Sequence, residues 1–261
     1  GIPNIVPNVF QLPEQRCSAA WADAVMICTW QMYLTYGDRE LLKEMFPCMQ
    51  KWVEYIRAQG ENKYLWNTGE HFGDWLGLDL DEETAKEQAK RGYYSGATNQ
   101  YLIATAFYAY DVALLIKAGE ILGEDMREYQ ELYDHIKTAF RKEFIKDNVL
   151  TSDTQTAWVL ALHFGLLPNP KEGAKHLLSL IKKTGHMTTG FVGTPYLLHV
   201  LHNNGYTKEA YSLLLREEYP SWLYSVKMGA TTMWEHWDGI RPDGSMWGAE
   251  MNSFNHYAYG A

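Results

Sequence analysis

Apolar residues recur at helical spacing along most of the chain and predict a series of helices. In the longest segment, 97–122, Tyr101, Ala104 and Tyr108 follow the spacing of one buried helical face, and Gly123 comes next as a helix end. Brief loops join most segments, so we expect eight helices in consecutive antiparallel pairs. The periodic segments are 19–36, 38–59, 97–122, 124–145, 153–164, 170–184, 193–203 and 207–215.

Local signals add detail to these helices. Asp38 is an N-cap candidate for the second helix, and Pro47 within that helix predicts a kink. Ser152 followed by Gln155 is a capping-box pattern at the start of 153–164. In the first helix one apolar stripe is predicted to face inward, and it consists of Trp21, Ala24, Val25, Cys28 and Met32.

Two segments lack a helical period. Residues 1–18 carry three prolines and predict an extended lead-in. Residues 61–96 form a long segment in which only the charged run DEETAKEQAKR indicates a short exposed helix, and long irregular segments in compact domains are usually functional. Because we find neither a β-hairpin signal nor a linker-like change of composition, the pattern predicts one all-α domain over residues 1–261.

The charge of the chain narrows its expected partners. With 23 Lys and Arg against 32 Asp and Glu, the formal net charge is −9, and no basic cluster stands out. Nucleic acid and anionic membrane surfaces would be repelled, so neither is an expected partner. No run approaches the about 18 consecutive apolar residues of a membrane span. The three cysteines lack metal-ligand spacing, and we expect neither a bound metal nor a cofactor.

The stretch 229–239, GATTMWEHWDG, carries the strongest chemical signal. It places the Glu235 carboxylate between Trp234 and Trp237, in a chain whose 10 Trp and 18 Tyr exceed what its core requires. Flat aromatic rings stack on the apolar faces of sugars, while acids, amides and histidines bind the hydroxyl groups. The stretch therefore indicates a carbohydrate site, with Glu235 as the candidate reactive group. A salt-bridged Glu among core tryptophans is the alternative.

A second stretch, 251–259, MNSFNHYAY, follows closely and adds polar groups to the same site. Asp238 and His256 are the candidate ligands for sugar hydroxyls here, and Trp237 is a candidate ring contact. Asp238 precedes Gly239 and is equally well explained as a turn residue. His256 is also explained as a half-buried histidine with its own protein partners.

The architecture resembles the (α/α)6 toroid, or six-hairpin barrel, of several carbohydrate-active enzymes. In that fold the loops at one end converge on a funnel. Three loops resemble funnel loops, and they are 18–24, 71–76 and 229–239 with its partner stretch 251–259. The segment 188–201 is expected to place a glycine-containing turn beside them.

Six motifs make the resemblance more specific, because together they look like the catalytic domain of the α-L-rhamnosidases of glycoside hydrolase family 78. They span residues 19–261 in the family's order and read AAWADA, YLTYGD, FGDWL, TGFVGTPYLL, GATTMWEHWDG and MNSFNHYAYGA. The resemblance implies an inverting hydrolase that removes terminal α-L-rhamnose, with Glu235 as general base. The positions that match the family's sugar contacts are Trp21, Asp74, Trp75 and His256.

One departure concerns the general acid. Inversion requires a second carboxyl group about 6.5–9.5 Å from the base. The family's acid lies in a motif resembling Asp-Glu-Arg followed by Gly-Trp, which does not occur in this sequence. We therefore expect an incomplete toroid that lacks its N-terminal helices and its acid, is inactive by itself, and has the remaining domains of a parent chain as partners. The sequence leaves the compartment open between cytoplasm, periplasm and secretion.

Other interpretations remain open at this stage. Asp74 in a Gly-Asp-Trp turn fits a turn-former or helix cap, and Trp21 on a helical stripe fits core packing. The rival enzymes are other toroid hydrolases, such as unsaturated glucuronyl hydrolases or trehalase-like enzymes. A domain that binds carbohydrate without cleaving it is the rival outside catalysis.

Overall fold

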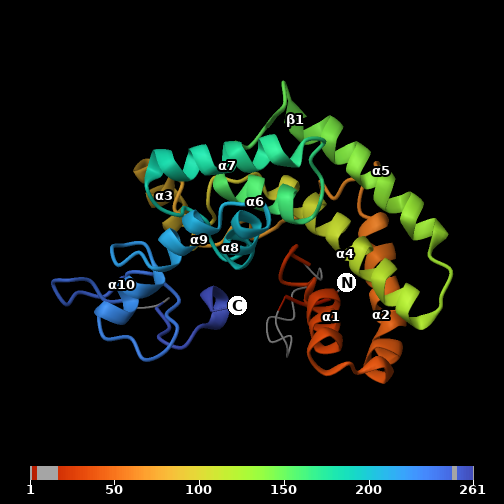
Figure 1. Cartoon of the computed structure of the whole chain (residues 1–261), viewed down its shortest axis with the longest axis horizontal. Coiled ribbons are helices and arrows are strands. Elements are labelled where there is room, and N and C mark those ends of the chain that lie inside the picture. The colour runs from red at the N-terminus through yellow and green to blue at the C-terminus, as the bar shows by residue number, and fades with distance from the viewer. Residues whose placement is uncertain (1, 5–16, 249–251, 261) are drawn as a thin grey trace. The chain divides into compact units, whose positions relative to one another are not determined.

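A computed structural model describes residues 2–4, 17–248 and 252–260 (Figure 1). The chain divides into two compact units, and each is described by itself. Unit 1 comprises Gly1–Gly73 and Asn99–Ser152, and unit 2 comprises Asp74–Thr98 and Asp153–Ala261. Most of the predicted lead-in falls outside the described residues. The single domain predicted over the whole chain stays a prediction.

Unit 1 is built around one buried helix, α4 (Gln100–Leu122). Helices α1 (Ala24–Tyr36), α2 (Arg39–Arg57) and α5 (Arg127–Phe144) all pack against it. α2 and α5 turn one apolar face inward, with Trp52 and Phe140 fully or nearly fully buried. These elements confirm the helices predicted there, including the Asp38 cap, which accepts the Leu41 N–H. Pro47 lies within α2, and the kink predicted there stays a prediction.

The way in which α4 packs explains why so long a helix is so apolar. By length and composition this helix could cross a membrane, but 83% of its most apolar window is buried inside the structure. A core helix surrounded by other helices is apolar on all sides for the same reason. Its ends agree with the sequence, because Asn99 caps the N-terminus and Gly123 ends the helix with a φ of 85°.

The predicted inward stripe of the first helix is wrong. Ala24, Cys28 and Met32 are exposed, and the buried positions of α1 are Met26 and Thr29. α1 is apolar on most sides, so periodicity alone could not select the face that packs. The helix also begins five residues later than the predicted start of 19–36.

The prediction of no β-hairpin is also wrong. Strands β1 (Ile145–Lys146) and β2 (Val149–Leu150) form a short antiparallel pair after α5. The two turn residues, Asp147 and Asn148, have φ of 51° and 64°, as a type I′ turn requires. Asp and Asn tolerate that conformation, so the Asp-Asn pair in the sequence was the signal for this hairpin.

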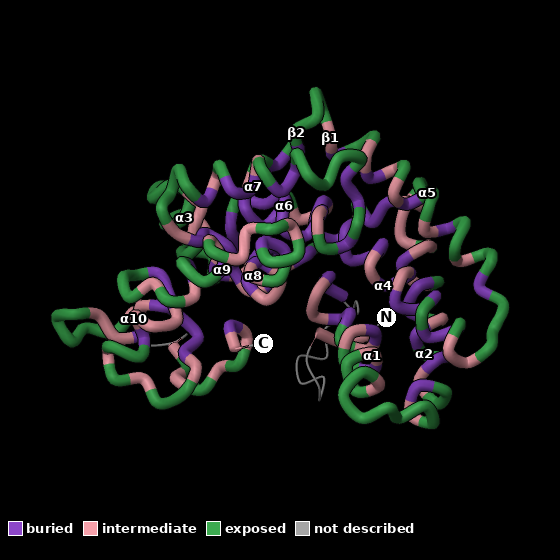
Figure 2. The backbone as a smooth tube through the Cα atoms, in the orientation of Figure 1, coloured by how far each residue is buried: buried purple, intermediate pink, exposed green. Residues whose placement is uncertain are grey.

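Unit 2 contains the remaining helices and long irregular segments. The predicted exposed helix is α3, and α6 lies at the buried centre of the unit, packed against α7 and α8 (Figure 2). The all-α class is confirmed by ten α-helices and one 3₁₀ helix among the described residues. The helices of unit 2 are α3 (Glu82–Ala89), α6 (Gln155–His163), α7 (Pro170–Thr184), α8 (Thr194–Asn203), α9 (Thr207–Leu214), α10 (Trp222–Lys227) and the 3₁₀ helix η1 (Tyr257–Tyr259).

The capping box predicted at Ser152 is wrong. Thr154 caps α6 and accepts the Ala157 N–H at 3.2 Å, while the Ser152 hydroxyl accepts the Asn99 N–H at 3.0 Å. The Gln155 side chain does not fold back on the helix start. It accepts the Thr188 N–H at 3.0 Å and so anchors the segment that follows α7.

Two buried carboxyl groups face each other across an indole in unit 1. Trp52 Nε1–H donates to Asp23 Oδ1 at 2.9 Å and to Asp111 Oδ2 at 3.0 Å, and both carboxyl groups are fully buried. Burial raises the pKa of both groups, and the Asp23 charge raises the pKa of Asp111 further. Two buried like charges beside one indole are costly, so we infer that the pair keeps a proton to a higher pH than an ordinary aspartate does.

We predict that this pair makes stability depend on pH. The folded protein keeps a proton that the unfolded chain loses above an ordinary aspartate pKa, so the free energy of unfolding falls as pH rises towards the folded pKa. The slope is at most about 1.4 kcal/mol per pH unit for one proton. Asp111→Asn, which replaces the protonated carboxyl by a neutral amide, should flatten this slope in urea unfolding at a series of pH values.

The control for this experiment is Asp134→Asn, on the exposed side of α5. This substitution should leave the pH slope unchanged. An equal slope in Asp111→Asn and in the unmodified protein would contradict the shared proton.

Candidate active site

The Asp74 carboxylate is the centre of a buried polar cluster in unit 2. Its Oδ2 accepts from the Gly190 N–H at 2.8 Å and the Thr156 hydroxyl at 2.5 Å, and its Oδ1 accepts from the Val192 N–H at 3.1 Å. Burial raises the pKa of Asp74 to about 6, although these three hydrogen bonds oppose the rise. At neutral pH an ionised Asp74 therefore fixes the turn at 190–192.

Backbone hydrogen bonds extend this cluster. The Asp74 carbonyl accepts the N–H groups of Gly77 at 2.9 Å and Gly96 at 2.8 Å, and the Trp75 carbonyl accepts the Phe191 N–H at 2.8 Å. Three segments far apart in sequence are thereby interlocked around one aspartate. Asp74 itself has no exposed surface, so the structure places this predicted sugar contact beneath the protein surface.

Phe191 connects this cluster to the C-terminal motif. Its ring centroid lies 5.0 Å from that of His256 and 4.9 Å from that of Tyr259. The Trp75 ring is half-buried and contacts Tyr93 and Tyr94 edge-on. Trp75 and His256, which the sequence predicts in one site, are thus linked through a single residue, Phe191.

Glu235 is held by a pair of neighbouring backbone segments. Its N–H donates to the Ser253 carbonyl at 2.8 Å, and its Oε2 accepts the Ser253 N–H at 2.8 Å. Two residues before Glu235 and three residues after Ser253, the two segments are joined again, because the His256 N–H donates to the Met233 carbonyl at 2.9 Å. This pairing brings Glu235 and His256 onto adjacent segments, as the sequence predicts.

The surroundings of Glu235 differ from those of a surface carboxylate. Its exposed fraction is 8%, and it forms no ion pair with any residue of the described chain. The flanking tryptophans are packed, because Trp234 contacts Phe254 edge-on and Trp237 stacks on Tyr259 with centroids 4.1 Å apart. Trp237 therefore has one ring face covered by protein.

Tyr259 lies within electrostatic reach of the acidic residues of the site. Burial raises its pKa well above the usual range, and the negative charges of Asp74, Glu235 and Asp238 raise it further. The Tyr259 hydroxyl therefore stays protonated and remains a hydrogen-bond donor at all ordinary pH values.

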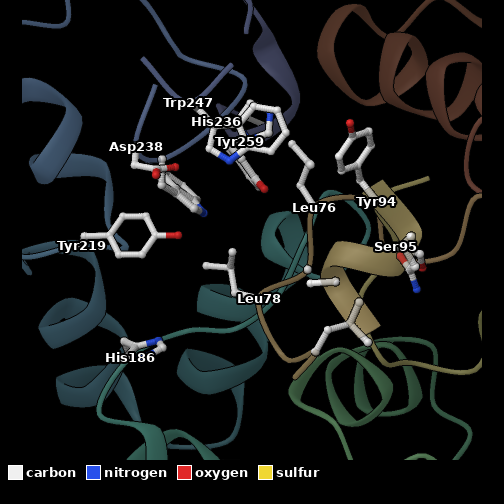
Figure 3. A pocket seen from close by; sticks show the side chains of 15 residues that line it. Leu76, Leu78, Tyr94, Ser95, His186, Tyr219, His236, Asp238, Trp247 and Tyr259 are labelled. Carbon is white, nitrogen blue, oxygen red and sulfur yellow. The ribbon is translucent and has the colours of Figure 1, made fainter. Parts of the chain in front are cut away.

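Trp237 and Asp238 line a cavity of about 330 Å³ in unit 2 (Figure 3). Glu235, Trp75 and His256 are not among the residues that line it. Asp238 Oδ2 also accepts from Arg241 Nε at 3.0 Å, so its predicted turn role and its place at the cavity coexist.

Trp21 belongs to unit 1, unlike the other predicted site residues. Its ring contacts Phe72 edge-on at 4.9 Å. The adjacent loop is held by His71, whose Nδ1 accepts the Ala19 N–H at 3.0 Å and whose Nε2 lies 3.1 Å from the Thr68 carbonyl. Burial lowers the pKa of His71 to about 4, so the ring is neutral with its proton on Nε2.

Sequence reasoning missed several of these residues. Phe191 and Thr156 act through tertiary contacts, and His71 begins the predicted funnel loop 71–76 but was not singled out within it. Phe191 does fall in the segment 188–201, for which the sequence indicates a turn near the site. Among the described residues, no group of three or more His, Cys, Asp or Glu could hold a metal ion.

Comparison with known proteins decides the family. The family model for the bacterial α-L-rhamnosidase six-hairpin glycosidase domain matches residues 1–261. The chain belongs to this family. Its α-L-rhamnosidase relatives include proteins from Streptomyces avermitilis, 39% identical over 93% of this chain, and from Formosa agariphila, 38% identical over all of it. This chain spans only 22% and 28% of those relatives.

Solved α-L-rhamnosidase structures agree with the fold. The Streptomyces avermitilis protein in complex with L-rhamnose superposes with a TM-score of 0.83 at 37% identity, over 93% of this chain and 22% of that one. The native Aspergillus terreus protein gives 0.88 at 33% identity, over 99% of this chain and 30% of that one. The predicted six-hairpin fold class is therefore confirmed.

We predict that this rhamnosidase-family domain depends on the absence of a side chain at Gly190. A Cβ there would lie 2.3 Å from the Trp75 carbonyl oxygen, 2.6 Å from the Gly77 nitrogen and 2.8 Å from Asp74 Oδ1. Gly190→Ala should lower the free energy of unfolding by about 2–3 kcal/mol or more, measured by denaturant titration.

Gly60→Ala is the matched control, since a Cβ there would meet no atom closer than 3.4 Å. It should change stability by no more than about 0.5 kcal/mol. If Gly190→Ala were as stable as this control, the interlocked arrangement around Asp74 would be wrong.

Proposed function

We propose that the protein hydrolyses terminal α-L-rhamnose from rhamnosides with inversion of configuration, using Glu235 as general base. The observation that carries this proposal is the pairing of the Glu235 and His256 segments in a chain of the rhamnosidase family. The Streptomyces avermitilis relative has been solved with L-rhamnose, which supports the same sugar as substrate.

The proposed reaction assigns one step to Glu235. One carboxylate oxygen is fixed by the Ser253 N–H, and the carboxylate takes a proton from a water molecule that attacks the anomeric carbon. The bond between that carbon and the leaving oxygen breaks as the new bond forms on the opposite face. A general acid must protonate the leaving oxygen, and we assign it to no residue of these 261.

The other site residues bind and orient the sugar in this proposal. His256 donates to or accepts from a sugar hydroxyl, and Trp75 offers a half-buried ring for stacking. Asp74 is the positioning residue, because its bonds to 190–192 hold Phe191 against His256. Trp21 remains a proposed contact from unit 1. The predicted inactivity of the isolated 261-residue chain also stays a prediction.

We predict that Glu235→Gln lowers kcat on p-nitrophenyl α-L-rhamnoside by about 10²–10⁴-fold in the complete protein, because an amide cannot take the proton. The substitution keeps the shape of the side chain, so KM should change little. Steady-state kinetics check both values.

The control is Glu218→Gln, whose side chain is 75% exposed, and it should leave both values unchanged. Full activity in Glu235→Gln would exclude Glu235 as the base. No turnover by the unmodified complete protein would instead favour a domain that binds sugar without cleaving it.

A further inference from the structure

The loop 18–23 leads into α1 in unit 1 and is held by two hydrogen bonds that run in opposite directions. The Ala19 N–H donates to His71 Nδ1 at 3.0 Å, and the Phe72 N–H donates to the Ser18 hydroxyl oxygen at 2.9 Å. Ser18, Ala19 and His71 are buried, so breaking either bond in place would leave a polar group without a partner. The position of the loop therefore depends on both bonds.

The bond to His71 requires a neutral imidazole. Nδ1 is the acceptor for the Ala19 N–H, so the ring proton is on Nε2, which lies 3.1 Å from the Thr68 carbonyl oxygen. A second proton can bind only to Nδ1, and it would turn this nitrogen into a donor that faces the Ala19 N–H. A protonated His71 is therefore incompatible with the closed loop.

The backbone of the loop is strained next to this bond. Ala20 has a φ of 70°, in the left-handed region that residues with a Cβ rarely adopt. The Ala20 N–H donates to Asp23 Oδ2 at 2.7 Å, which helps to hold this conformation. Trp21 is the next residue, and its ring contacts Phe72 edge-on. Loss of the bond at Ala19 would let this backbone relax and would move Trp21.

The side chains packed around His71 are uncharged. The rings of Trp66 and of Tyr101, which belongs to α4, lie edge-on to the imidazole with centroids 4.7 Å and 6.1 Å away. A tyrosine is neutral at acid and neutral pH. On the segment of His71 itself, the adjacent Glu70 is exposed. His71 is therefore the group of this cluster that can gain a proton between pH 7 and pH 4.

The direction of the pH effect follows from burial. Burial lowers the pKa of His71 from 6.5 to about 4, although the Thr68 carbonyl opposes this. A hydrated ring in the released loop would regain the ordinary value, so between these two values the released form binds a proton that the closed form does not. Release is therefore favoured as pH falls. Asp23 and Asp111 act in the opposite direction, because their pKa is raised in the folded protein.

We propose that His71 is a positioning residue for Trp21 and that protonation of its ring releases the loop 18–23, so that His71 and this loop form an acid-sensitive clasp. The consequence for catalysis rests on the proposed function, in which Trp21 contacts the sugar. The clasp itself follows from the hydrogen bonds within unit 1.

Hydrogen–deuterium exchange of peptides covering 18–23 in the complete protein, at about pH 7 and about pH 4.5 and corrected for intrinsic exchange rates, tests the clasp. His71→Asn keeps an acceptor near the position of Nδ1 but cannot titrate. Protection of the loop should fall about 50-fold more in the unmodified protein than in His71→Asn, the factor that pKa values of 6.5 and about 4 give. Peptides from α4 should stay protected, which distinguishes local release from unfolding.

Two further variants complete the test. His135→Asn, at an exposed histidine of α5, should keep the pH dependence of the unmodified protein. His71→Gln is a second neutral variant and replaces His71→Asn if that protein fails to fold.

Steady-state kinetics with p-nitrophenyl α-L-rhamnoside test the positioning of Trp21. Between about pH 6.5 and about pH 4.5, KM should rise at least about 2-fold more in the unmodified protein than in His71→Asn, whereas kcat should change equally in both.

Equal pH dependence of loop protection in the unmodified protein and in both His71 variants would overturn the clasp. Release of the loop with no difference in KM would overturn the positioning role for Trp21. No turnover by the unmodified complete protein would refute the proposed function, and the exchange measurement would still decide the clasp.

Discussion

The buried Asp74 carboxylate is the constraint on which the candidate site depends. Its two oxygens hold the 190–192 turn and the start of α6, and its carbonyl holds two further loops. An ionised group with no exposure is stable only when its hydrogen bonds are satisfied, so the surrounding backbone cannot move independently of it. Asp74 acts on the chemistry by fixing shape, at a position beneath the groups that would meet a sugar.

Contacts that start at the Asp74 cluster also position the residues that are proposed to bind and hydrolyse the sugar. Phe191, fixed by the Trp75 carbonyl, packs against His256 and Tyr259, and the paired backbone segments then hold Glu235 beside His256. Few of these hydrogen bonds and ring contacts are strong individually. Together they place a carboxylate, a histidine and an aromatic ring in one unit, the combination that binding and hydrolysis of a sugar require.

The sequence predicted the helices and their ends better than it predicted the roles of the site residues. Both ends of α7 agree with the predicted segment, because Pro170 and Gly185 are strong local signals. The packed face of α1 was wrong because that helix is apolar on most sides. The position of Glu235 beside His256 follows from motifs, whereas the burial of Asp74 and the bridging role of Phe191 are tertiary contacts that no local pattern encodes.

In the proposed reaction Glu235 activates a water molecule for direct displacement. This role can be tested by proton NMR of the anomeric region during the first minutes of rhamnoside hydrolysis by the complete protein, before the released sugar equilibrates. Direct displacement predicts that β-L-rhamnose appears first and that the α anomer follows by mutarotation. Initial release of α-L-rhamnose would require a covalent intermediate and would contradict the role of Glu235 as general base.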